Sequence, residues 1–214
     1  MHAESAIAPQ FEDAAQQRSA ALLGMWLFLA TEILFFGALF LSYTVYRLRT
    51  PEAFHSASEH TLIVMGTLNT AVLLLSSGTM VLAVRAGELR QRLMTAGLLA
   101  VTAALGATFL VVKGFEYVGE IHEGLFPGSQ FRFAGGDPVG ARMFFYLYFL
   151  MTGVHALHVF IGIVLLGIFT LRALLTRRLE RMATALDLLG LYWHFVDIVW
   201  VFLFPLLYLA GRHT

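Results

Sequence analysis

The sequence predicts an all-α fold, an integral membrane bundle of five transmembrane helices. Hydrophobic residues make up 58% of the chain and charged residues only 13%, whereas soluble domains carry roughly 25% charged residues. The mean hydropathy is +0.75, and the apolar residues gather in stretches of about 20 residues or more, the length that crosses a bilayer. Since lipid offers no partner to exposed backbone groups, each stretch is expected to be a helix.

The apolar stretches are separated by polar segments that mark the ends of the helices. Residues 1–19 form a polar, mildly acidic tail without the basic start of a cleaved signal peptide, and we expect them to be flexible or to lie on the surface. The membrane domain is then residues 20–214, with helices expected at about residues 20–46, 61–84, 93–117, 141–172 and 186–210. Three dipeptides predict irregular turns between the third and fourth helices: Pro127-Gly128, Gly135-Gly136 and Asp137-Pro138.

Arginine clusters predict the orientation in the membrane. Two turns on the same side as the N-terminal tail carry these clusters: Arg85, Arg90 and Arg92 in one, and Arg172, Arg177, Arg178 and Arg181 in the other. Cytoplasmic loops carry an excess of Lys and Arg. We therefore predict that the N-terminus lies inside and the C-terminus outside.

Charge and cysteine content exclude several kinds of protein. The formal net charge is +0, which gives no electrostatic basis for binding nucleic acid. The chain has no Cys, and this excludes disulfides, iron–sulfur clusters and a thiolate copper site. A phosphate loop and a Gly-rich dinucleotide motif are also missing.

The last predicted helix contains an unusual polar stretch at residues 192–200. On a helix, His194 and Asp197 are three positions apart and share a face, while Trp193 and Trp200 are seven apart and share another. An ionisable pair in hydrocarbon costs several kcal/mol unless it is paired or faces protein. We therefore expect a buried functional or packing face, with a structural His194–Asp197 contact as the alternative.

A carboxyl and two histidines fall inside other predicted helices. Glu32 is about 18 Å into the first helix at 1.5 Å per residue, where a carboxyl is expected to be protonated or hydrogen-bonded. His155 and His158 share one face of the fourth helix, and His155 reaches a similar depth. We therefore expect Glu32 to hydrogen-bond to His155. This contact is interpreted either as a proton-related or ion site or as a structural bond between helices.

Metal and haem chemistry has weak support in the sequence. His155, His158 and His194 supply possible axial haem ligands, but carboxylates are too few for a di-iron site of the helical-bundle kind. We predict no catalytic residue and no metal site in this chain.

Charged residues near the two membrane surfaces are further candidates. Lys113 and Glu116 are three apart near the outer end of the third helix, where they can pair with each other or extend to the interface. At the inner surface, Arg172, Arg177 and Arg178 are expected to meet lipid headgroups.

Five blocks of the sequence, in their order along the chain, resemble motifs of subunit III of the haem-copper terminal oxidases, the cytochrome c oxidase subunit III family. The stretch at residues 192–200 is similar to the family's signature. The other similar blocks are residues 31–36 (TEILFF), 68–70 (LNT) with 74–78 (LLSSG), 116–117 (EY) and 153–159 (GVHALHV). Together they extend from about residue 24 to the C-terminus.

The resemblance implies an accessory, non-redox subunit of an aerobic respiratory oxidase in a bacterial inner membrane. Haem and copper are then expected in subunits I and II, while this chain packs on subunit I, binds phospholipid and supports proton uptake and stable turnover. By position, Glu32 matches the family's buried, carbodiimide-reactive carboxyl, and His155 matches the histidine expected near it. Trp193 and Trp200 join the three arginines as candidates for lipid contact.

The number of helices departs from the pattern of many family members. Those members have seven spans, and the two extra helices precede the carboxyl-bearing helix and form one wall of a lipid cleft. The five-span form resembles bacterial oxidases, including quinol oxidases. We therefore expect either that another subunit supplies the missing wall or that the lipid contacts subunit I alone.

Two other functions remain as alternatives. A subunit-III-like protein associated with nitric oxide reductase shares the five-span form. An independent proton or ion transporter would use the buried ionisable residues, although the paired repeats with broken helices that are frequent in transporters are not visible. Whether the electron donor is cytochrome c or quinol stays open, because that choice lies in subunit II.

Overall fold

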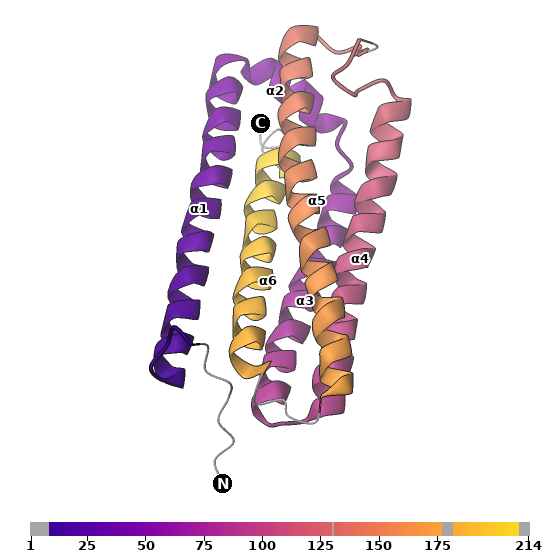
Figure 1. Ribbon diagram of the computed structural model, residues 1–214. Helices are drawn as coiled ribbons and strands as arrows, with labels where there is room; N and C mark the ends of the chain where they lie inside the picture. The colour runs from indigo at the N-terminus through magenta and orange to yellow at the C-terminus, as the bar shows by residue number, and fades with distance from the viewer. Residues whose placement is uncertain (1–8, 130, 177–181, 210–214) are drawn as a thin grey trace.

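The computed structural model is a bundle of long α-helices closed at one end by a short helix (Figure 1). It describes residues 9–129, 131–176 and 182–209. The helices long and apolar enough to cross a membrane are α1 (Ala14–Arg49), α3 (Ile63–Glu88), α4 (Arg92–His122), α5 (Pro138–Leu175) and α6 (Ala183–Phe204), the last continued by a π-helical turn, η2 (Pro205–Leu209). The prediction of five spans is confirmed, and the described residues contain no strand.

Two spans, α1 and α5, begin before the predicted residues 20 and 141, and each has a polar cap at its N-terminal end. Asp13 caps α1, and its carboxylate accepts a hydrogen bond from the Gln16 N–H at 2.6 Å. Asp137 caps α5 in the same way and accepts from the Val139 N–H at 2.9 Å. Pro138 suits the first helical position, where its missing N–H costs nothing.

A short helix that was not predicted, α2 (Pro51–Glu59), follows α1 directly. Its apolar side buries Phe54, whose ring centroid lies 5.3 Å from that of Tyr43 on α1 and 5.5 Å from that of Phe144 on α5. Gly140 leaves room for this contact, because a Cβ there would lie 2.5 Å from the Cβ of Ala53. α2 thereby joins α1 to α5 at this end of the bundle.

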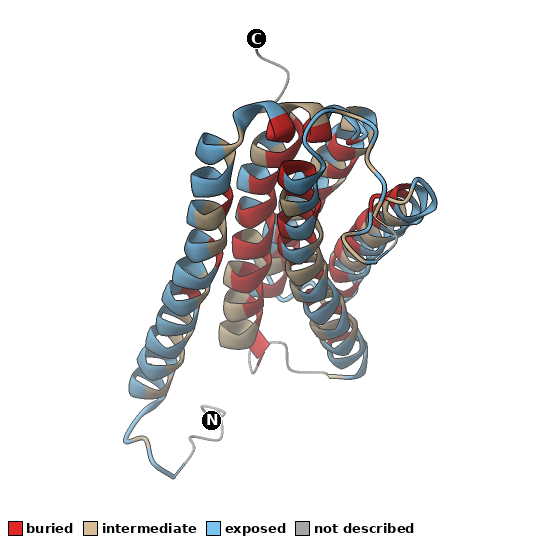
Figure 2. Cartoon of the chain, turned by 90° about the horizontal axis from the view of Figure 1, so that it is seen from above, coloured by how far each residue is buried: buried red, intermediate tan, exposed pale blue. Residues whose placement is uncertain are grey.

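The central helix of the bundle is α6. In its apolar stretch 56% of the residues are buried, against 11% in α1, and Figure 2 shows this contrast as red along the interior helices and pale blue along α1. α6 packs against α3, α5 and α1, whereas α4 packs against α3 and α5. α1 is therefore an edge helix.

The helical path changes at the end of α6. Pro205 has no N–H and cannot donate to the carbonyl four residues earlier, and the chain continues as the wider turn η2. This turn buries Leu207 and Tyr208. α1 begins and η2 ends at opposite ends of the bundle (Figure 1), as an odd number of spans requires. Which end faces the cytoplasm stays a prediction.

Two glycines make room for Trp193, a large and fully buried side chain. A Cβ at Gly106 on α4 or at Gly162 on α5 would lie 2.7 Å from the ring of Trp193, which is 0% exposed. Close approach of α4, α5 and α6 around this indole therefore depends on both positions having no side chain.

We predict that Gly162→Ala lowers the free energy of unfolding by about 1–3 kcal/mol, because the buried Trp193 ring must shift. The matched control is Gly167→Ala on the same helix, where a Cβ would have nothing within 4 Å. Thermal unfolding of the purified protein in detergent measures both variants. Equal stability of the two would contradict this description of the packing.

Candidate functional site

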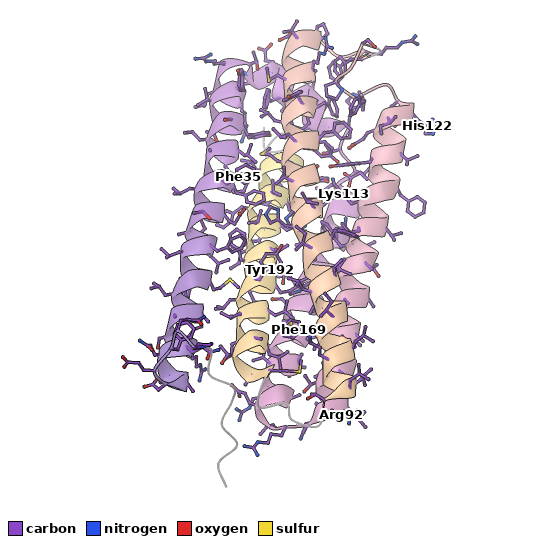
Figure 3. The ribbon with its side chains drawn as sticks, viewed as in Figure 1. Phe35, Arg92, Lys113, His122, Phe169 and Tyr192 are labelled. Carbon is purple, nitrogen blue, oxygen red and sulfur yellow. The ribbon has the colours of Figure 1, made fainter. Side chains whose placement is uncertain are left out.

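A buried cluster of four polar side chains ties three elements together: Lys113, Glu116, Tyr148 and Tyr208, here called the Lys113 cluster. Lys113 projects from α4 in the half of that helix nearer His122 (Figure 3) and is 2% exposed. Its ammonium donates to Glu116 Oε2 at 3.0 Å. It also donates to the hydroxyls of Tyr148, at 2.7 Å, and Tyr208, at 2.6 Å. Both hydroxyls donate onward to Glu116 Oε1, at 2.9 Å and 2.7 Å.

Within the Lys113 cluster the ammonium is paired with the Glu116 carboxylate, and the hydrogen bonds of both groups are complete. All three N–H groups of the ammonium and both carboxylate oxygens of Glu116 have partners. The ammonium also lies 4.5 Å from the ring centroid of Tyr148, a favourable cation–π distance. The predicted pairing of Lys113 with Glu116 is found. The alternative, that both side chains extend outward to the interface, is not found, because both are buried inside the protein. Hydrogen bonds to Tyr148 on α5 and Tyr208 on η2 stabilise both groups inside the protein.

Trp193 and Trp200 both face α3. Their indole N–H groups donate to Ser76 Oγ at 3.1 Å and to Thr70 Oγ1 at 3.0 Å. Both side chains are 0% exposed. The predicted common face is confirmed, and the expectation that these two residues contact lipid is wrong, because the bundle encloses them.

His155 is buried in an aromatic environment. It is 0% exposed, with ring centroids 5.5 Å from Phe109 and 5.3 Å from Trp200. Among the described residues neither ring nitrogen has a hydrogen-bond partner. The predicted hydrogen bond to Glu32 is therefore wrong.

The partner of Glu32 is His158. Glu32 Oε2 and His158 Nε2 are 3.1 Å apart, and the two side chains are 19% and 15% exposed. A helix turns about 100° per residue, so positions 155 and 158 point about 60° apart around α5. This difference turns His155 into the core and His158 toward α1.

The other nitrogen of His158 fixes the protons of this pair. Nδ1 lies 2.9 Å from the carbonyl oxygen of Val154, which can only accept, so Nδ1 carries a proton. Nε2 then either accepts from a protonated Glu32 or donates to its carboxylate. Both arrangements hold a single proton between the two groups and have no net charge, which reduces the cost of placing them in a membrane.

The Glu32–His158 pair lies in the wall of a groove of about 650 Å³ between α1, α5 and α6, here called the α1–α5 groove. The rest of the lining is mostly apolar and includes Phe169 and Tyr192, which Figure 3 labels on α5 and α6. The Tyr192 hydroxyl donates to the His158 carbonyl at 3.0 Å, and this bond fixes α6 against the turn of α5 that carries the pair.

Comparison with known proteins gives the family. A family described as cytochrome c oxidase subunit III matches residues 1–212. The chain belongs to the cytochrome c oxidase subunit III family. Similar curated proteins include cytochrome c oxidase subunit 3 of Bacillus sp. (strain PS3), 33% identical with 99% of each chain covered. Cytochrome c oxidase subunit 3 of Thermostichus vulcanus is 33% identical over 89% of this chain and 88% of its own. Quinol oxidase subunit 3 of Bacillus spizizenii is 33% identical over 89% of this chain and 87% of its own.

Membership of the subunit III family confirms the resemblance inferred from the motifs. The relatives named above are bacterial, and five apolar spans fit a multi-pass protein of the inner membrane. Because the relatives include subunits of both cytochrome c and quinol oxidases, the similarity does not separate the two electron donors.

The other predicted residues of this subunit III chain do not form one site. His194 Nδ1 pairs with Ser77 Oγ at 2.8 Å. Asp197 is 4% exposed, and neither of its carboxylate oxygens has a hydrogen-bond partner among the described residues. The alternative of a direct His194–Asp197 hydrogen bond is therefore not found. Over the described ranges no three His, Asp or Glu side chains come together in a way that could hold a metal ion.

The arginines predicted at the inner surface are only partly within the described residues. Arg172 is exposed at the end of α5, with its guanidinium 5.9 Å from the ring centroid of Phe169 in the α1–α5 groove. Arg177 and Arg178 lie outside the described residues.

Sequence reasoning missed the two tyrosines of the Lys113 cluster and the buried Glu120, which is 5% exposed. The depth of residues along the helices gave one usable signal for Tyr148. The end of α4 and the start of α5 lie at the same end of the bundle. Lys113 is nine residues before the end of α4 and Tyr148 ten residues after the start of α5, so both reach the same level. Tyr208 gave no such signal, because its direction depends on the π-helical turn.

We predict that Lys113→Met lowers the free energy of unfolding by about 3–5 kcal/mol, because Glu116 is left buried without its cation. The double variant Lys113→Met/Glu116→Gln should recover part of this loss. The control is Arg85→Met, which breaks an ion pair with Glu88 whose side chains are 66% and 51% exposed, and which should cost about 1 kcal/mol or less. Unfolding in detergent measures all three, and equal losses in the Lys113 and Arg85 variants would contradict the prediction.

Proposed function

We propose that this chain is an accessory, non-redox subunit III of a haem-copper terminal oxidase in an aerobic respiratory chain. In this proposal it packs on subunit I, binds phospholipid, and supports proton uptake and stable turnover, while haem and copper lie in partner subunits. The observation that carries the proposal is the family match over residues 1–212. The closed Lys113 cluster supports it, since its polar atoms are used to hold helices together.

The Glu32–His158 pair is the group that we assign to proton supply. It holds one proton in a neutral arrangement, and its side chains are partly exposed in the α1–α5 groove. A proton taken up or released there changes the net charge by one unit next to the membrane-facing surface. The pair is therefore suited to buffer protons near a partner subunit, with no part in redox chemistry.

Phospholipid binding is assigned to the α1–α5 groove. The apolar lining of the groove suits the acyl chain of a lipid. Arg172 lies beside Phe169, at the end of the groove where a lipid headgroup would be. A guanidinium there is placed to bind a headgroup phosphate. Because Trp193 and Trp200 are enclosed, they have no part in this site.

The test of the function is purification from the native membrane through a tag on this chain, followed by a visible spectrum and identification of the co-purifying chains. We expect haem bands together with the oxidase core subunits. Glu32→Gln should leave the haem spectrum unchanged and slow proton-coupled turnover, because it removes the shared proton. A colourless preparation without partners, or loss of haem bands in the variant, would overturn the proposal.

For the lipid site, we predict that Arg172→Leu lowers the amount of phospholipid retained by the purified complex, since the headgroup loses its cation. Arg85→Leu is the control, because Arg85 is also an exposed arginine at a helix end but lies outside the α1–α5 groove. Phosphate analysis of extracted lipid gives the measurement. Unchanged lipid content in the Arg172 variant would contradict this assignment.

A further inference from the structure

His194 presents an unpaired polar atom to the membrane. Its Nδ1 is held by Ser77 on α3. The ring is partly exposed, and the described residues provide no partner for Nε2. His194 lines the groove between α1 and α6 as well as a second groove between α3 and α6. The imidazole therefore stands on the ridge where α1, α3 and α6 meet the surface.

The position of His194 along α6 places Nε2 deep in the membrane. The span Ala183–Leu209 has 27 residues, or about 40 Å at 1.5 Å per residue. His194 is eleven residues from its start, about 16 Å along it. The polar headgroups lie outside a hydrocarbon core about 30 Å thick, so they do not reach this nitrogen.

Other membrane-facing polar groups satisfy themselves within their own helix. The hydroxyls of Ser42, Thr67 and Thr108 each donate to the carbonyl four residues earlier, at 2.8, 2.8 and 2.9 Å. A histidine side chain whose Nδ1 is fixed on α3 cannot turn Nε2 back to its own backbone. His194 thus needs a partner that this chain does not supply.

The groove beside His194 has the size and surface of a helix-docking site. It encloses about 420 Å³ between α1 and α6, and apart from His194 its lining is apolar, with exposed Trp26 and Phe202 among the residues. Gly37 lies in its wall, and a Cβ there would meet nothing within 4 Å. Such small residues permit close approach of a neighbouring helix in lipid.

We propose that the α1–α6 groove with His194 docks a transmembrane helix of a partner oxidase subunit, and that this helix hydrogen-bonds His194 Nε2 through a polar side chain near the middle of the membrane. The inference rests on the proposed function. An acyl chain fills an apolar groove but offers no hydrogen-bonding atom at this depth. A protein side chain offers one, and an interhelical hydrogen bond of this kind stabilises association in lipid.

The direct test is photo-crosslinking in the assembled complex, with p-benzoylphenylalanine replacing Phe202 in one variant and Phe115 in the other. Phe202 lines the α1–α6 groove and is 59% exposed, whereas Phe115 is 68% exposed on α4. Both replacements are aromatic, so the fold is expected to tolerate them equally. We expect light to join position 202, and not position 115, to an oxidase core subunit identified by mass spectrometry.

A second measurement tests the hydrogen bond itself. His194→Leu should weaken retention of this chain by the complex about three- to twentyfold, the range expected for an interhelical hydrogen bond. Ser77→Ala is the control, because it removes the inward bond of the same imidazole and leaves Nε2 in place. Retention is measured as the fraction of this chain that stays with the core during detergent titration.

The outcomes separate this inference from the proposed function. If the chain co-purifies with the core but position 202 crosslinks only to lipid, or only to a second copy of this chain, the docking inference fails and the accessory role stands. Equal retention of His194→Leu and Ser77→Ala would also overturn the inference. If no core subunit co-purifies at all, the proposed function fails first.

Discussion

The hydrogen-bond closure around Lys113 is the interaction on which the rest of the structure depends. Hydrocarbon offers no water to a buried charge, so the ammonium must be satisfied within the protein. Its partners come from three elements: Glu116 from α4, Tyr148 from α5 and Tyr208 from η2. The π-helical turn after Pro205 carries Tyr208 into this arrangement. A local break in helical geometry therefore supplies long-range hydrogen bonds to the buried Lys113–Glu116 ion pair.

Because hydrocarbon offers no hydrogen-bond partner, polar groups on the outer surface of the bundle are candidates for functional contacts. Helices α3 to α6 pack closely, and α1 stands at their edge with a groove on each side. One groove carries the neutral Glu32–His158 pair, and the other carries the unpaired nitrogen of His194. An edge helix flanked in this way is consistent with the proposed role of contacting lipid and neighbouring chains.

Most of the fold followed from the sequence, because spanning length and hydropathy alone determine five helices. The contacts within it followed less completely. On a helical wheel, residues 155 and 158 share a face. The difference of about 60° between them is nevertheless enough for His155 to contact Trp200 and for His158 to contact Glu32. Hydropathy likewise suggested that Lys113 could extend to an interface. It gave no sign of the two tyrosines that hydrogen-bond to Lys113, because they come from segments distant in the sequence. α2 was missed since nine residues cannot be recognised by a criterion of spanning length.

The central claim is that the ionisable residues of this chain join helices, share protons and contact partner subunits, and that none of them ligates a redox group. Cryo-electron microscopy of the complex purified from the native membrane tests it most directly. The account predicts this chain at the side of the haem-bearing core, with Glu32 within hydrogen-bond distance of His158. A haem or metal ion ligated by His155, His158 or His194 would contradict it.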